Sequence, residues 1–131
     1  MTVSRTLAKY IADQAERFTG DTGYSAIGAV VGDTYPEEAR LLRKIMPNNY
    51  FLVPGYGVQG GSAVDVLPCS NIDGLGAIVN LSRGILYSHM SDPVCNICTK
   101  EEYLKSVYQA TKAMQQELYC ILKANCANMR Y

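Results

Sequence analysis

The chain has 131 residues, of which 48% are hydrophobic, and its 12 basic and 12 acidic side chains leave no net charge. The length suits one domain with a hydrophobic core. The neutral charge excludes a strongly basic surface for nucleic acid or an anionic membrane, and the apolar runs fall far short of the ~20 residues that cross a bilayer.

The cysteine count and the N-terminal sequence bear on the compartment. The chain starts with Met1-Thr2-Val3-Ser4-Arg5 and lacks the apolar block of a signal peptide. It contains five cysteines, an odd number. Both features favour free thiols in a reducing cytoplasm.

The first half of the chain predicts a helix, a strand and a second helix. Apolar residues recur every three or four positions over residues 4–18, which is typical of an amphipathic helix. Residues 26–31 form a continuous apolar run without alternation, so we expect a strand buried on both faces. Thr34 and Glu37 have the spacing of a capping box and predict the start of the next helix, which ends before Pro47.

The second half continues the alternation of strands and helices. Residues 50–53 and 77–80 are predicted strands, with a short helix over residues 62–67 between them. Thr99 and Glu102 again have capping-box spacing and predict the start of a last long helix. The apolar stripe of that helix consists of Leu104, Val107, Tyr108, Thr111, Met114, Leu118, Ile121 and Leu122. Strands that alternate with helices predict one parallel sheet.

Two segments that follow predicted strands could bind an anion. Residues 54–61 contain four glycines, and successive backbone N–H groups in such a loop can hold an anion. Arg83 follows the next strand and offers a planar, permanently charged fork that suits phosphate oxygens. Each feature alone is more often an ordinary turn or surface residue. Together at adjacent strand ends they favour a phosphate site, because barrels of alternating strands and helices often bind phosphate there.

Several of these segments resemble orotidine 5′-phosphate decarboxylases, in the bacterial group with longer chains. Residues 23–32 resemble the sixth-strand segment of that family, and residues 34–38 match the helix start that follows it. Residues 51–61 resemble its phosphate-loop motif, and residues 80–84 resemble the end of its eighth strand. The resemblance implies an α/β fold: residues 1–131 would be a single partial domain, the C-terminal portion of a (β/α)8 TIM barrel, with about three parallel strands in an incomplete barrel.

The resemblance also implies roles for individual residues. Gln59 would contact both phosphate and pyrimidine, and Arg83 would grip the phosphate with the backbone amides of Ser82 and Arg83. The phosphate-binding residues implied in this way are Gln59, Arg83, Ser82, Gly57 and Gly60. The loop that closes over the nucleotide would include Pro54, Gly55 and Tyr56. For Tyr56 a packing role is as well supported as a ligand contact.

Three departures from the family pattern stand out. Asp33 replaces a residue that is usually a small alanine, and we expect it to be exposed to solvent. Leu81 replaces a residue that is usually small and polar. The catalytic array of the family, Asp-x-Lys-x-x-Asp with a further lysine, does not occur in the sequence. Decarboxylation needs a lysine that protonates the developing carbanion, so this chain alone is expected to be inactive as a carboxy-lyase.

The resemblance favours a fragment of a lyase that converts orotidine 5′-phosphate to UMP in pyrimidine biosynthesis. Three alternatives remain open: a non-catalytic module that binds nucleotide phosphate, a structural half-barrel that oligomerises, and a relative of phosphosugar aldolases or synthases.

Three strands cannot close a barrel, so a second copy or a complementing N-terminal half is expected to cover the sheet. We expect no nucleic-acid or membrane partner and no cofactor. Cys95 and Cys98 have metal-ligand spacing, but ordinary thiols are favoured over a metal site.

Overall fold

The computed structural model describes residues 2–57, 62–91 and 99–128. Its helices and strands, in chain order, are α1 (Val3–Ala15), β1 (Ser25–Val30), α2 (Pro36–Ile45), β2 (Asn49–Pro54), α3 (Ala63–Val66), β3 (Ala77–Asn80), α4 (Ser82–Leu86) and α5 (Lys100–Asn128). Short 3-10 turns follow α1, α3 and α4 as η1 (Glu16–Phe18), η2 (Leu67–Cys69) and η3 (Ser88–Ser91). All the predicted strands and longer helices are present, and α4 is an addition to them.

The three strands form one parallel sheet in the order β1-β2-β3. Phe51 of β2 is paired with Ala77 of β3, and Pro54 is paired with Asn80 at the far end of the same two strands. The carboxyl ends of β2 and β3 therefore lie side by side, and the segments that leave them start from neighbouring positions. The parallel sheet predicted from the alternation of elements is confirmed.

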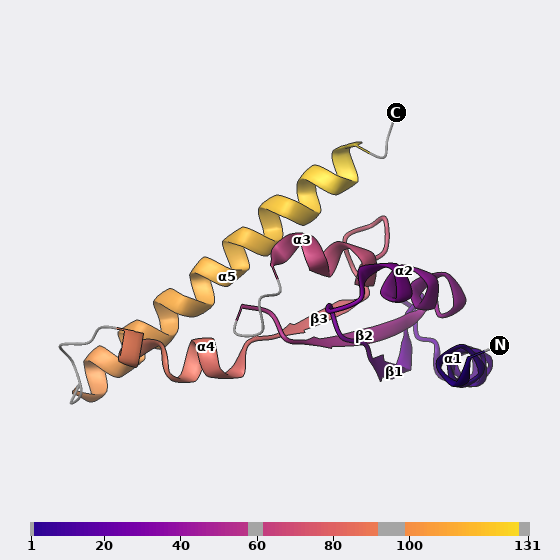
Figure 1. Ribbon diagram of the computed structural model, residues 1–131, viewed down its shortest axis with the longest axis horizontal. Helices are drawn as coiled ribbons and strands as arrows, with labels where there is room; N and C mark the ends of the chain where they lie inside the picture. Colours follow the sequence, from indigo (N-terminus) through magenta and orange to yellow (C-terminus); the bar gives the residue numbers. More distant parts are fainter. Residues whose placement is uncertain (1, 58–61, 92–98, 129–131) are drawn as a thin grey trace.

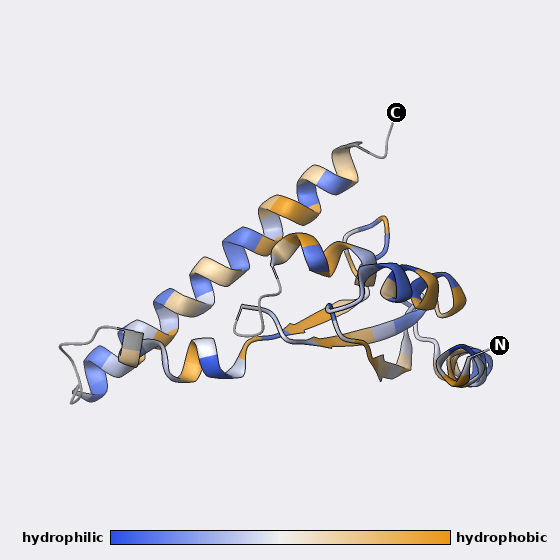
Figure 2. Cartoon of the chain, in the orientation of Figure 1, coloured by the Kyte–Doolittle hydropathy of each residue, from blue (hydrophilic) through white to orange (hydrophobic). Residues whose placement is uncertain are grey.

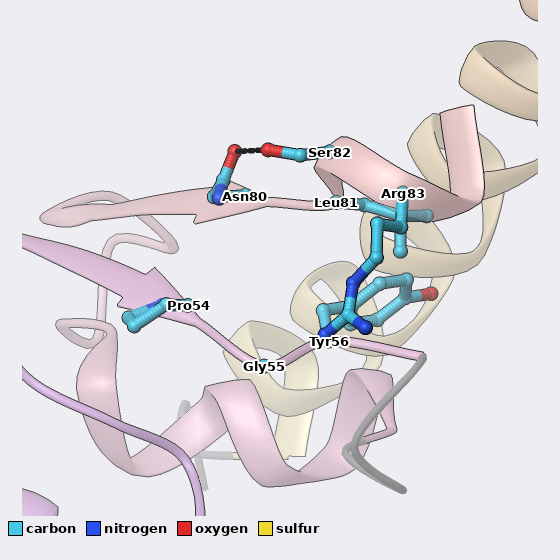
Figure 3. Close-up of a pocket in the computed structure, with 7 residues that line it drawn as sticks. All are labelled: Pro54, Gly55, Tyr56, Asn80, Leu81, Ser82 and Arg83. Carbon is cyan, nitrogen blue, oxygen red and sulfur yellow. Dashed lines mark hydrogen bonds between the residues drawn. The ribbon is translucent and has the colours of Figure 1, made fainter. Parts of the chain in front are cut away.

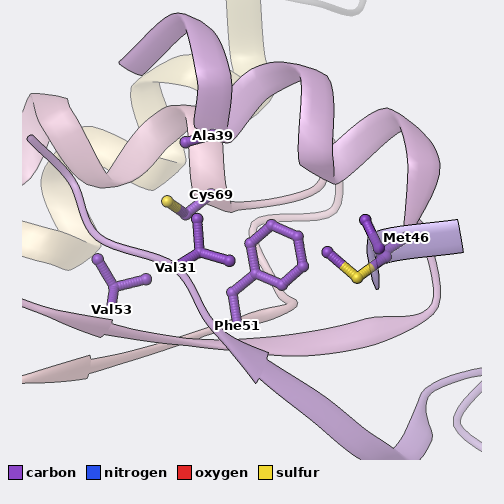
Figure 4. Packing of buried hydrophobic residues seen from close by; sticks show 7 residues of the cluster. Val31, Ala39, Met46, Phe51, Val53 and Cys69 are labelled. Atoms are coloured by element: carbon purple, nitrogen blue, oxygen red, sulfur yellow. The ribbon is translucent and has the colours of Figure 1, made fainter. Parts of the chain in front are cut away.

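One face of the sheet carries the hydrophobic core. Figure 1 shows α2, α3 and α5 on the same side of the strands. Phe51 and Val53 of β2 have no exposed surface and pack with Ala39 and Met46 from α2 and the turn after it (Figure 4). Complete burial of such a side chain contributes about 1.5–3 kcal/mol, so this cluster holds α2 onto the sheet.

The opposite face of the sheet is open. Val30 of β1, Leu52 of β2 and Ile78 of β3 are 70%, 40% and 53% exposed, and their register places them in one row across the strands. The prediction that the first strand is buried on both faces is wrong, because no element of the described residues covers this side. An apolar row on a parallel strand normally faces another layer or the interior of a barrel.

The ends of the longer helices test the predicted capping boxes. The prediction for Thr34 and Glu37 is wrong: Tyr35 precedes the first residue of α2, no side chain caps it, and Pro36 occupies the first turn, where its fixed φ suits a helix. The prediction for Thr99 and Glu102 is confirmed. The backbone N–H of Glu102 donates to Thr99 Oγ1 at 3.3 Å, and the backbone N–H of Thr99 donates to Glu102 Oε2 at 2.8 Å.

The long helix α5 is only partly covered. Met114, Leu118 and Ile121 pack against the cluster around Tyr56, as the predicted stripe requires. Leu104 and Tyr108, at the start of that stripe, are exposed. Figure 2 shows hydrophilic and hydrophobic residues interspersed along α5. None of the helices in the described ranges is both long enough and apolar enough to cross a membrane.

Candidate functional site

A hollow opens where β2 and β3 end. Its volume is about 230 Å³. Its lining consists of Pro54, Gly55, Tyr56, Asn80, Leu81, Ser82 and Arg83 (Figure 3). Parallel pairing explains why these residues meet, since Pro54 and Asn80 are directly opposite each other at the strand ends. The structure thus brings residues 54–56, the start of the glycine-rich segment, close to the arginine. Folds of alternating strands and helices typically hold their ligands at this end of the sheet.

Arg83 supplies the positive charge of the hollow. Its residue lies in α4, where the sequence predicted only the end of a strand and a loop. The side chain is exposed, and no ion pair of Arg83 occurs within the described ranges. Figure 3 shows it extending from α4 toward the segment that leaves β2. Its guanidinium donors are therefore available to an anion in the hollow.

Ser82 and Asn80 line the β3 side of the hollow. The Ser82 hydroxyl donates to Asn80 Oδ1 at 3.2 Å, and both side chains are exposed. This hydrogen bond joins the last residue of β3 to the first residue of α4. It fixes the direction in which the chain leaves the strand, and so the place from which Arg83 extends.

Tyr56 lies in the wall of the hollow and is only 6% exposed. Its hydroxyl donates to Glu117 Oε2 of α5. Burial, together with this hydrogen bond and the nearby carboxylate, raises the pKa of Tyr56 to about 12. The phenol consequently stays protonated and remains a donor to Glu117. The observed contacts are those of the packing role that the sequence left open for Tyr56.

Leu81 fills the space between the two segments that border the hollow. A Cβ atom on Gly57 would lie 3.1 Å from Leu81 Cδ1, and one on Gly84 would lie 2.6 Å from the same atom. Gly57 also has a φ of +78°, a conformation that side chains other than glycine rarely adopt. The two glycines let the backbone on each side approach this leucine closely, and its neighbours include residues of the Tyr56 cluster.

Some of the predicted site residues lie outside the described ranges. Gln59 and Gly60 are among them, so their implied contacts with phosphate and pyrimidine stay predictions. Cys95 and Cys98 also lie outside these ranges. Within residues 2–57, 62–91 and 99–128, no three His, Cys, Asp or Glu side chains are close enough to hold a metal ion.

Asp33 is placed differently from its predicted position. It is only 5% exposed, so the expectation of an exposed side chain is wrong. Residues 31 and 33 continue the alternation of β1, which turns both toward the covered face of the sheet. Asp33 contributes to the raised pKa of the buried Cys69 thiol, which is about 11 mainly because of burial. It is not among the residues that line the hollow.

Glu117 is a site neighbour that sequence reasoning missed. It lies three residues after Met114 and four before Ile121, at the edge of the apolar stripe of α5. That spacing places a carboxylate beside the buried cluster, and this was the available signal. Asn80, the last residue of β3, was likewise not singled out, although strand ends are where such side chains gather.

The fold is that of part of a β/α barrel. A crystal structure of a Toxoplasma gondii protein assigned as an orotidine-monophosphate decarboxylase superposes with a TM-score of 0.68 and 24% sequence identity. The superposition covers 94% of this chain and 42% of that one. At this identity the likeness establishes the fold alone. The strands β1, β2 and β3 are therefore a stretch of a barrel wall, and the open face is its inner side.

Sequence comparison defines the relationship more narrowly. The orotidine 5′-phosphate decarboxylase of Rhodopirellula baltica is 38% identical over 117 residues, which is 89% of this chain and 39% of that protein. The enzyme of Caldicellulosiruptor bescii is 38% identical over 112 residues, 86% of this chain and 35% of that protein. No family model matches the chain. The chain is thus a homologue of the orotidine 5′-phosphate decarboxylases that spans less than two fifths of the length of these relatives.

Proposed function

We propose that this chain forms the phosphate-binding part of an orotidine 5′-phosphate decarboxylase active site. One observation carries the proposal: the ends of two adjacent parallel strands enclose a hollow into which Arg83 extends an unpaired guanidinium, as far as the described residues show. A guanidinium can donate two parallel hydrogen bonds to phosphate oxygens, and backbone N–H groups of Ser82 and Arg83 would supply more. Gln59, Gly57 and Gly60 complete the proposed set from the β2 side.

The proposed reaction of the whole enzyme releases CO₂ from orotidine 5′-phosphate and places a proton on the ring carbon, which gives UMP. In this proposal the chain binds the phosphate, which is far from the bond between the ring carbon and the carboxylate that breaks. Binding energy from such a remote group holds the substrate in position for the reacting residues. Because the Asp-x-Lys-x-x-Asp array is absent from the sequence, we propose that the chain alone does not decarboxylate.

A partner that closes the barrel follows from the same proposal. The row Val30, Leu52 and Ile78 needs an apolar cover, and β1 and β3 need strands at their free edges. A segment with the remaining strands and the catalytic array would satisfy both needs, and a second copy of this chain is the alternative. The odd number of cysteines favours free thiols and supports a cytoplasmic location for the assembly.

The test is calorimetric titration of the purified chain with UMP, beside an Arg83→Ala variant and an Arg17→Ala variant. Arg17 is also exposed but lies in η1, away from the hollow, and is the matched control. We expect binding by the wild type and by Arg17→Ala, and at least a tenfold loss in Arg83→Ala, about the effect of one charge-assisted hydrogen bond. Absence of UMP binding by the wild-type chain, or equal binding by Arg83→Ala, would contradict the proposal.

The second candidate, a nucleotide-phosphate-binding module without catalysis, rests on the missing array. It predicts the same titration result, so a second measurement separates the two. Release of CO₂ from orotidine 5′-phosphate is followed with the chain alone and after addition of a segment that carries an Asp-x-Lys-x-x-Asp array. Activity that appears only with both chains favours the enzyme, and tight UMP binding without activity in either mixture favours the module.

A further inference from the structure

The helix α5 reaches the hollow from a distant part of the sequence. Glu117 accepts a hydrogen bond from the hydroxyl of Tyr56, 61 positions earlier in the chain. Both α3 and α4 pack against α5. The contact therefore joins the tail of the chain to the segment that leaves β2.

Apolar side chains surround the Tyr56 end of this hydrogen bond, whereas Glu117 is exposed. Tyr56, Ala63 and Val66 are buried together, and Met114 and Leu118 of α5 pack against them. Leu81 belongs to the same set and also lines the hollow. The helix α5 therefore packs behind Tyr56 and Leu81, two of the residues that line the hollow. The Tyr56–Glu117 hydrogen bond lies at the edge of this apolar contact, because Tyr56 is buried and Glu117 is exposed. A hydrogen bond to a charged acceptor is stronger than one between neutral groups.

We infer that Glu117 is a positioning residue for the phosphate site: by accepting the hydrogen bond of Tyr56 it holds residues 54–57 in the place where they face Arg83. This inference rests on the proposed function. The substrate-facing groups come from β2 and from the β3–α4 junction, and α5 contributes none of the lining residues. Glu117 acts on the ligand only through Tyr56.

The direction in which UMP affinity changes when Glu117 is replaced distinguishes positioning from a simple effect of charge. A carboxylate close to an anion site repels a phosphate, so its removal by itself would strengthen binding. Positioning predicts the reverse, because loss of the acceptor frees Tyr56 and the backbone that carries it. A direct contact between the Tyr56 hydroxyl and phosphate makes a third prediction: only the tyrosine substitution would weaken binding.

The experiment is UMP titration of the whole chain in four single variants and one double variant. Glu117→Ala removes the acceptor and its charge, Glu117→Gln removes the charge but keeps an acceptor oxygen, and Tyr56→Phe removes the donor. Glu101→Ala removes an exposed carboxylate from the first turn of α5 and is the control. Circular dichroism at 222 nm verifies that each variant keeps its helices.

We expect Glu117→Ala and Tyr56→Phe to weaken UMP binding by about three- to tenfold, which corresponds to the net contribution of one hydrogen bond. Glu117→Gln should recover most of the affinity, and Glu101→Ala should bind like the wild type. The double variant Tyr56→Phe/Glu117→Ala should be no weaker than either single variant, because both remove the same interaction.

Other results overturn the inference. Tighter binding by Glu117→Ala and Glu117→Gln would mean that the carboxylate acts only through its charge. Weaker binding by Tyr56→Phe with unchanged binding by Glu117→Ala would mean that the tyrosine contacts the ligand itself. If the wild type does not bind UMP, both the proposed function and the role of Glu117 are refuted. If Arg83→Ala alone loses UMP binding, the proposed function stands, and the Glu117 variants then test the positioning role.

Discussion

At the residue scale, Arg43 joins more of the molecule than any residue of the hollow. It is 6% exposed, and its guanidinium donates to the carbonyl oxygens of Cys69, Met46, Asn49 and Gly76 at 2.7–3.0 Å. The same group lies 3.6 Å from the centre of the Phe51 ring. Burial lowers the pKa of Arg43, and its charge is balanced by carbonyl dipoles. One side chain thereby connects α2, η2 and the starts of β2 and β3.

An Arg43→Lys substitution should destabilise the fold by about 2 kcal/mol or more, because an ammonium cannot reproduce the planar fork and leaves buried carbonyls without donors. The measurement is urea unfolding followed by circular dichroism. Arg40 lies three residues earlier in α2 with an exposed side chain, so Arg40→Lys is the control. It should change the free energy of unfolding by less than about 0.5 kcal/mol. Equal stability of the Arg43→Lys variant and the wild type would show that the carbonyl contacts contribute little.

Asp33 presents the opposite situation. Its Oδ2 atom is buried and has no hydrogen-bond partner in the described part of the chain. An unsatisfied buried acceptor costs about 1–3 kcal/mol, so Asp33→Ala should raise the stability by an amount in that range. The midpoint of urea unfolding measures the change, and Asp21→Ala, at an exposed turn, is the control. A loss of stability in Asp33→Ala would refute the view that this carboxylate is unsatisfied.

At the element scale, α5 depends on its first turn. Thr99 and Glu102 satisfy each other's backbone N–H groups. The backbone N–H and the hydroxyl of Thr99 both donate to the Glu102 carboxylate, and these two hydrogen bonds lower the pKa of Glu102. A lowered pKa means that the folded state favours the carboxylate. This contribution is therefore present above the ordinary pKa of 4.5 and is lost as the pH falls through the lowered value.

A Thr99→Ala substitution should remove the cap and fray the start of α5. Amide hydrogen exchange of residues 100–103 should become faster, while exchange near Leu118, where α5 packs on the Tyr56 cluster, should hardly change. In the wild type, acidification below the pKa of Glu102 should speed exchange at the same first turn, once the intrinsic effect of pH is corrected. Uniform acceleration along all of α5 would mean that the helix opens as one unit and that the cap has no local role.

The elements show what a sequence can and cannot predict. Strands β1, β2 and β3 were predictable because short apolar runs end at Pro and Gly signals, and the Thr99 cap was predictable because its motif is local. The side of β1 that lacks cover was not predictable, since an apolar run does not say whether its second layer lies in the same chain. The link from Tyr56 to Glu117 was also beyond reach, because it depends on how α5 docks and not on any short motif. The convergence of Arg83 with residues 54–56 was predictable from the rule for parallel strand ends.

At the scale of the whole molecule, the open face dominates. Val30, Leu52 and Ile78 form an aligned apolar row. Within the described chain no further strand pairs with the outer edges of β1 and β3, although Ser25 of β1 forms a single bridge with Thr19. Such a surface favours association with another sheet or with a missing part of the same barrel. The hollow lies at the strand ends and not on this face. The surface that needs an apolar cover is therefore distinct from the surface that would bind the ligand.

A Leu52→Lys substitution should therefore abolish association and leave the chain folded. Sedimentation velocity should show a species larger than a monomer for the wild type and a monomer for the variant, since a lysine in the middle of the row blocks an apolar contact. Leu75→Lys, exposed but outside the strands, should associate like the wild type. A monomeric wild-type chain would argue against self-association and leave the complementing segment as the proposed cover.

The hydrogen bond between Tyr56 and Glu117 also affects the order in which parts of the chain can fold during synthesis. The strand pairs β1–β2 and β2–β3 join residues close to one another in the sequence, so the sheet and the Arg43 contacts can form while the ribosome is still adding the tail. The support of Tyr56 is different, because it needs Met114, Glu117 and Leu118. A chain released before α5 is made would have its strands and its arginine but an unsupported Tyr56. Whether the site can hold a ligand thus depends on α5, which is synthesised after all three strands.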